Sequence, residues 1–107
     1  MPELLNPLTE PDVWTEAPTQ GETQLDPPYR ILLHNDDVTP IDFVMAVLHT
    51  VFYFSMLDAE RITMKAHYEG MAYVTTLPLE EAKYRVGKAH GMARAAGYPL
   101  TFSIEPE

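Results

Sequence analysis

Apolar residues recur with the spacing of strands and helices from residue 29 to the end of the chain. Residues 29–34 form a short run that is rich in strand-forming residues and apolar on both faces, which is typical of a covered strand. Residues 71–77 predict a second strand. Near the C-terminal end, Leu100, Phe102 and Ile104 alternate with polar residues, which predicts a half-buried third strand.

Three other segments carry apolar residues at helical spacing. The first follows Thr39, which can cap a helix, and Pro40, which suits a first turn because its missing N–H would have no partner there. Asp58 can cap a second helix that ends at Gly70. Residues 79–96 predict a third helix, whose apolar face consists mainly of alanine and permits close approach to a sheet.

The predicted elements follow the order βααβαβ. Three strands with helices on one side make a two-layer α+β domain, here a three-stranded antiparallel sheet packed against three helices. The chain has 107 residues, which fits one domain with a modest core.

Residues 1–27 differ in composition from the rest of the chain. They hold six acidic residues and no lysine or arginine, and six of the ten prolines lie within residues 1–28. Few apolar residues are present there to offset the entropy of ordering. We therefore expect a disordered, acidic, proline-rich N-terminal extension at 1–27, ahead of a folded domain at 28–107.

The formal net charge of −9 argues against nucleic acid as a partner, because phosphate binding depends on clustered lysine and arginine. The absence of cysteine excludes disulfides and thiolate metal sites. No apolar run approaches the roughly 18 residues of a membrane span, and no basic segment precedes an apolar one at the N-terminus. We expect a cytoplasmic monomer that does not bind membranes.

The densest polar cluster lies between the first strand and the first helix, at His34-Asn35-Asp36-Asp37. Asparagine and aspartate favour turns by bonding to their own backbone, so the run alone can be turn chemistry. Its position between apolar segments, however, puts the carboxylates at the rim of a core. His67 lies near the end of the second helix, and the negative charge of the helix C-terminus can by itself explain a histidine at this position. The remaining histidines have no motif around them.

These residues give poor support to catalysis. His34, Asp36, Asp37 and His67 lack the spacing of a zinc site, and ligands on adjacent residues rarely converge on one ion. No serine lies in a nucleophile-elbow motif, and no cysteine is present. The sequence therefore favours a binding protein over an enzyme, with no metal and no cofactor.

The order and spacing of several sequence blocks resemble the ClpS family. The resemblance covers about residues 29–105 and requires these blocks to coincide without a gap. They are Tyr29-Arg30-Ile31-Leu32-Leu33-His34-Asn35-Asp36-Asp37, Thr39-Pro40, Phe43-Val44 and His67-Tyr68-Glu69-Gly70. ClpS proteins are adaptors of the N-degron pathway: they bind proteins with a bulky hydrophobic N-terminal residue and deliver them to a ClpA- or ClpC-type AAA+ unfoldase of the Clp protease.

The resemblance implies that Asn35, Asp36 and His67 surround the free α-amino group of the substrate. An ammonium group offers three donors and no acceptor, so it requires acceptors and negative charge. An amide oxygen, a carboxylate and a neutral imidazole nitrogen can supply them. The positions matched to the pocket for the substrate's first side chain are Leu33, Thr39, Ile41, Val44, Thr63, Ala66 and Leu100.

Three of these pocket positions depart from the usual residues of the family. Ile41 stands where methionine is typical, Thr63 replaces another methionine, and Ala66 replaces a valine. Two of the changes remove volume and one adds a hydroxyl, while a β-branched isoleucine has fewer rotamers than methionine. We expect a wider, slightly more polar pocket floor with a stiffer gate, which favours Phe, Tyr and Trp over Leu.

Glu80 and Arg85 match positions on the face that, in the family, binds the N-terminal domain of the unfoldase, although such a pair is commonly only a solvated helix surface. The extension is implied to engage the unfoldase pore. Two alternatives remain. The altered pocket is compatible with a ClpS-like regulator of the unfoldase that does not bind degrons. The βααβαβ order also resembles the C-terminal domain of the ribosomal stalk protein, a general protein-interaction module.

Overall fold

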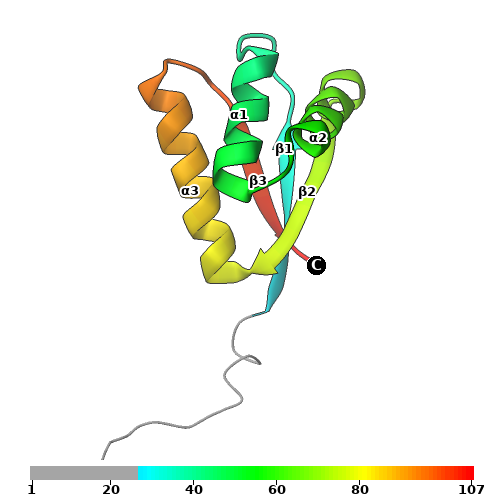
Figure 1. Ribbon diagram of the computed structural model, residues 1–107. Coiled ribbons are helices and arrows are strands. Elements are labelled where there is room, and N and C mark those ends of the chain that lie inside the picture. The colour runs from blue at the N-terminus through cyan, green and yellow to red at the C-terminus, as the bar shows by residue number, and fades with distance from the viewer. Residues whose placement is uncertain (1–26) are drawn as a thin grey trace, which may run out of the picture.

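The computed structural model describes residues 27–107, so the predicted extension at 1–27 lies outside the described residues except for Pro27. The strands form one antiparallel sheet in the order β2-β1-β3. Figure 1 shows the three helices on one side of this sheet, which confirms the predicted two-layer α+β fold. The elements are β1 (Pro28–His34), α1 (Ile41–Phe52), α2 (Met56–Glu69), β2 (Met71–Pro78), α3 (Leu79–Ala95) and β3 (Thr101–Pro106).

Strand β1 lies at the centre of the sheet, and its middle residues are buried consecutively, as the covered-strand pattern predicts. Ile31 and Leu33 belong to the main core. Leu32 lies outside that core, but it is also only 6% exposed. Leu32 lies between its cross-strand partners Tyr73 and Ser103, which explains its burial.

The pairing of β1 brings several connections to one end of the sheet. His34, the last residue of β1, pairs with Met71, the first residue of β2, and with Thr101, the first residue of β3. The end of β1 therefore lies beside the end of α2, which leads into β2, and beside the turn after α3, which leads into β3. Figure 1 shows the start of α1 at this same end.

The core fills the space between the sheet and the helices. Helix α3 contributes Ala82, Ala89 and Ala93, which are fully buried and allow the close approach that the sequence predicts. Helix α1 packs mainly on α2 and α3. Its last residue, Phe52, reaches the sheet, where its ring centroid lies 5.3 Å from that of Phe102.

The predicted cap of α1 is wrong. The helix begins at Ile41, and Pro40 occupies the flanking cap position in an extended conformation with no side-chain hydrogen bond. Because Pro40 takes this position, Thr39 lies one residue too early to cap the helix. Its hydroxyl instead donates to Asp36, at 2.9 Å.

The predicted start of α2 is also wrong, because the helix begins at Met56 and not after Asp58. Oγ of Ser55 accepts the N–H of Asp58 at 3.1 Å and so caps the helix. Serine and aspartate are comparably good N-caps, and the earlier of the two is used here. The predicted stops are confirmed, since Gly70 and Gly97 both adopt positive φ, at 91° and 83°.

Candidate functional site: a pocket at the end of the sheet

A cavity of about 300 Å³ lies at the end of the sheet where these connections meet. This volume is at the lower limit of typical small-ligand pockets. Every residue predicted for amine binding or for the hydrophobic pocket is part of its lining. The lining residues are Leu33, His34, Asn35, Asp36, Asp37, Val38, Thr39, Pro40, Ile41, Val44, Thr63, Ala66, His67 and Leu100.

The sheet register explains how residues from distant parts of the chain meet in this pocket. The N–H of Asn35 donates to the carbonyl of Gly70 at 3.0 Å, so the polar turn after β1 is bonded directly to the end of α2. His67 lies in the last turn of α2. The Tyr68 ring lies edge-on to the His67 ring, with centroids 5.1 Å apart.

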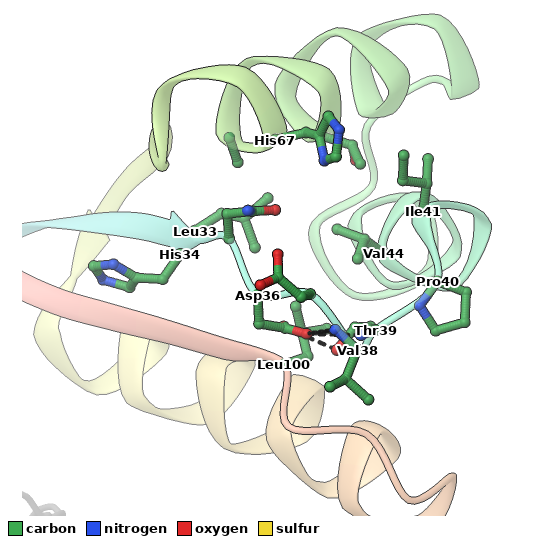
Figure 2. A pocket seen from close by; sticks show the side chains of 14 residues that line it. Leu33, His34, Asp36, Val38, Thr39, Pro40, Ile41, Val44, His67 and Leu100 are labelled. Atoms are coloured by element: carbon green, nitrogen blue, oxygen red, sulfur yellow. Dashed lines mark hydrogen bonds between the residues drawn. The ribbon is translucent and has the colours of Figure 1, made fainter.

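The pocket has an apolar floor and a polar mouth. Asn35, Asp37 and His67 are exposed at the mouth, and Figure 2 shows the His67 ring projecting from α2 toward the space between Asp36 and Ile41. Ile41 is 38% exposed, which suits a residue at the entrance. The buried lining residues are Leu33, Val44, Thr63, Ala66 and Leu100.

Asp36 organises the turn as well as lining the pocket. Its Oδ1 accepts the N–H groups of Val38 and Thr39 at 2.8 and 2.7 Å, and its Oδ2 accepts the Thr39 hydroxyl at 2.9 Å. Burial alone would raise the pKa of Asp36, but these hydrogen bonds and the positive charge of Arg94 outweigh it and lower the pKa. Asp36 is therefore an anion at neutral pH, and its carboxylate retains acceptor capacity on Oδ2.

Thr63 adds less polarity to the floor than its hydroxyl suggests. The Oγ1 atom donates to the carbonyl of Ala59, one turn earlier in α2, at 2.7 Å. The donor is thus satisfied within the helix. Together with the small side chain of Ala66, this leaves a floor that is open and mostly apolar.

The structure adds lining residues that the sequence had not assigned to the pocket. His34, Asp37, Val38 and Pro40 all border the cavity, and Val38 is 63% exposed. Their position within the predicted turn was a signal, since the assigned residues Asn35, Asp36 and Thr39 come from the same turn. His34 also contacts Ser103, with Nε2 and Oγ 2.6 Å apart.

Glu80 and Arg85, assigned to the unfoldase interface, lie outside the lining. Glu80 is exposed in the first turn of α3 and lies 3.6 Å from Lys83. Arg85 is more constrained: it donates to Glu81 at 3.0 and 2.7 Å and to the carbonyl of Val51 at 2.7 Å. Its side chain is only 19% exposed.

Among residues 27–107, no cluster of three or more His, Asp or Glu side chains is arranged to hold a metal ion. Within the same part of the chain, no helix combines the length and the apolar character needed to cross a bilayer.

Comparison with known proteins identifies the family. The model of a family described as "ATP-dependent Clp protease adaptor protein ClpS" matches residues 24–103. The chain belongs to the ClpS family. This confirms the resemblance predicted from the ordered sequence blocks.

Several ClpS proteins are similar over most of their length. The ClpS of Desulfatibacillum aliphaticivorans is 38% identical over 98% of this chain and 93% of its own. The ClpS of Nautilia profundicola is 44% identical over 72% of this chain and 79% of its own. A solved structure of Agrobacterium tumefaciens ClpS2 bound to L-phenylalaninamide aligns with a TM-score of 0.74 and 38% identity, over 77% of this chain and 99% of that one.

Proposed function

We propose that this protein is an adaptor of the ATP-dependent Clp protease that binds the free N-terminal amine and the bulky hydrophobic first residue of N-degron substrates. The observation that carries the proposal is one cavity that joins a buried apolar floor to a mouth of amide, carboxylate and imidazole groups. L-phenylalaninamide, which the Agrobacterium relative binds, has both a free α-amino group and an aromatic side chain.

The mouth suits a primary ammonium group. Asp36 supplies negative charge, Asn35 an amide oxygen and His67 a ring nitrogen, which together can accept the three hydrogen bonds of the ammonium group. An acetylated N-terminus has no charge and fewer donors, so it would leave these acceptors unpaired. Recognition of this kind requires no chemical step, and we propose binding without catalysis.

The floor determines which first residue is preferred. Ala66 and Thr63 leave room beside Leu33 and Leu100, and β-branched Ile41 gives a stiff entrance. We propose that Phe, Tyr and Trp are preferred over Leu. One methylene of mismatch is worth only ~1–3 kcal/mol, so Leu-first substrates still bind.

Delivery requires a second surface that stays free when the pocket is occupied. We assign it to the start of α3, at Glu80 and Arg85, which belong to neither the floor nor the mouth of the cavity. The partner proposed is the N-terminal domain of a ClpA- or ClpC-type AAA+ unfoldase, and residues 1–27 are proposed to engage its pore.

Fluorescence anisotropy with labelled peptides tests the pocket. We expect tight binding of a Phe-first peptide with a free amine, weaker binding of a Leu-first peptide, and at least about a 100-fold loss when the Phe-first peptide is acetylated. Equal affinity for the free and acetylated peptides would contradict amine recognition. Binding of the unfoldase N-terminal domain without any peptide binding would instead support the degron-independent regulator.

A further inference from the structure

The turn between α3 and β3 forms part of the pocket wall through Leu100, which is 1% exposed. Helix α3 ends in a Schellman arrangement: the N–H of Gly97 donates to the carbonyl of Arg94 at 3.0 Å, and the N–H of Tyr98 donates to that of Ala93 at 2.8 Å. These backbone bonds fix the chain as far as Tyr98. Leu100 lies beyond them and before the first residue of β3.

The Arg94 side chain links this interval to the helix. Nη1 of Arg94 donates to the carbonyl of Tyr98 and to the carbonyl of Leu100, both at 2.9 Å. The two carbonyls flank Pro99, which has no N–H with which to form a backbone turn of its own. Hydrogen bonds from a charged donor are roughly twice as strong as neutral ones. Arg94 therefore connects the helix end to the residue that forms the wall.

The same turn also contacts the opposite side of the pocket. The Tyr98 ring packs edge-on against Phe43 of α1, with centroids 4.9 Å apart. Phe43 lies between Ile41 and Val44, which line the cavity. A shift of the turn would thus disturb both the Leu100 wall and the start of α1.

We propose that Arg94 is a positioning residue for this pocket: its contacts with the Tyr98 and Leu100 carbonyls hold the Leu100 wall in the conformation that binds the substrate's first side chain. The inference rests on the proposed function. Arg94 is not part of the lining and acts through the turn. Arg94 raises the fraction of molecules in which the Leu100 wall is in place. The apparent affinity is proportional to this fraction, so it falls when the contacts of Arg94 are removed.

The sign of the effect separates this role from simple electrostatics. Arg94 is a cation whose charge is felt at Asp36, so its charge repels an ammonium group in the mouth. Removing that charge alone would strengthen binding. Removing the contacts with the turn weakens peptide binding. The loss is greatest for peptides with a large first residue, because such a residue touches more of the wall.

The test uses the full chain with Arg94→Met, which keeps an apolar stem but removes the donors and the charge. Fluorescence anisotropy is measured with Phe-first and Leu-first free-amine peptides. We expect affinity for the Phe-first peptide to fall about tenfold, with a smaller loss for the Leu-first peptide. Arg61→Met is the matched control: it removes a helical arginine that pairs with Asp58 on α2 outside the lining, and its affinities should stay within about twofold of wild type.

Unchanged or increased affinity of folded Arg94→Met for the Phe-first peptide would overturn the positioning role. The positioning role would also be overturned if Arg94→Met lost affinity for the Phe-first and Leu-first peptides by the same factor and Arg61→Met showed the same loss. If thermal unfolding shows that Arg94→Met does not fold, Arg94→Lys decides, because it keeps the charge but its ammonium nitrogen lies one bond closer to the backbone than the Nη1 atom that donates to both carbonyls. Weakened Phe-first binding then supports the role, and wild-type affinity overturns it. Failure of the wild-type protein to bind any free-amine peptide would instead overturn the proposed function.

Discussion

The two halves of α3 contact opposite ends of the domain and support different structures there. In the N-terminal half, Arg85 donates to the carbonyl of Val51 at the end of α1, and its guanidinium lies 4.7 Å from the centre of the Tyr53 ring. In the C-terminal half, His90 accepts the N–H of Phe102, and Arg94 bonds to the turn before β3. Both halves use side chains to satisfy backbone groups, but only the C-terminal half supports the pocket.

The two proposed activities, peptide binding and unfoldase binding, are therefore supported by opposite ends of one helix. Arg85 and Arg94 are nine residues apart, which is roughly 13 Å along a helix axis. Changes at such separations, with no shared contacts, usually have additive effects. Substitutions at the pocket should therefore leave the unfoldase surface intact, and substitutions at the start of α3 should leave peptide binding intact.

The largest expected effect is at the pocket, in Asp36→Asn. The substitution keeps the shape of the side chain and the Oδ1 acceptor of the Val38 and Thr39 N–H groups, but it removes the negative charge that we propose to face the ammonium group. Hydrogen bonds to charged groups contribute about 1.5–3 kcal/mol, so affinity for a Phe-first peptide should fall about 10- to 100-fold. Calorimetric titration with this peptide measures the loss, and affinity for the unfoldase N-terminal domain should not change.

Asp37→Asn is the matched control, because Asp37 is the adjacent carboxylate and is exposed. Solvent screens an exposed charge, so the loss should be less than about threefold. Equal losses in the two variants would show that the mouth attracts the amine by its total charge and not through Asp36.

A smaller effect is expected at the other end of α3, in Arg85→Met. The variant should bind the unfoldase N-terminal domain about tenfold more weakly and should be about 1–2 kcal/mol less stable, because the Val51 carbonyl loses its donor. The Glu81–Arg85 pair, whose partners are one helical turn apart, adds only ~0.3–0.5 kcal/mol. Titration with the domain and urea unfolding measure the two quantities.

Glu80→Gln sharpens this result. Glu80 makes only an exposed contact with Lys83 at 3.6 Å, so the substitution should weaken unfoldase binding without changing the urea midpoint. If Arg85→Met loses stability but keeps wild-type affinity for the domain, Arg85 serves the end of α1 alone.

The elements could be predicted from the sequence because their signals are local and strong. Gly70 and Gly97 end helices where positive φ is needed, and alternation near the C-terminus revealed β3. The start of α2 was missed because Ser55 and Asp58 are both good caps, and sequence alone does not rank them. Thr39 was misassigned because Pro40 itself occupies the cap position.

The composition of the pocket could be predicted only through the family resemblance, since no local pattern links Asn35 to His67. Residues that bond to backbone groups left no signal at all. His90 and Arg94 are one helical turn apart and could equally have been a solvated pair. Their partners are backbone groups near the start of β3, whose position depends on the completed sheet.

The smallest expected effect concerns His90, whose contact with β3 requires a neutral ring. Its Nε2 accepts the N–H of Phe102 at 2.9 Å, which a protonated imidazole cannot do. Burial, followed by the positive charge of Arg94, lowers the pKa of His90 below its ordinary value of 6.5. The unfolded chain therefore binds a proton at this residue at higher pH than the folded domain does. Stability from His90 is complete above about pH 6.5 and is lost as pH falls toward the lowered pKa.

Urea unfolding at pH 7.5 and at pH 5 can isolate this contribution. In His90→Gln an amide oxygen can still accept the N–H of Phe102 but no longer titrates, so the free energy of unfolding should fall less between the two pH values than in the wild type. The other titrating groups are common to both proteins and cancel in the comparison. Identical pH dependence in His90→Gln and the wild type would mean that protonation of His90 does not weaken the attachment of β3 to α3.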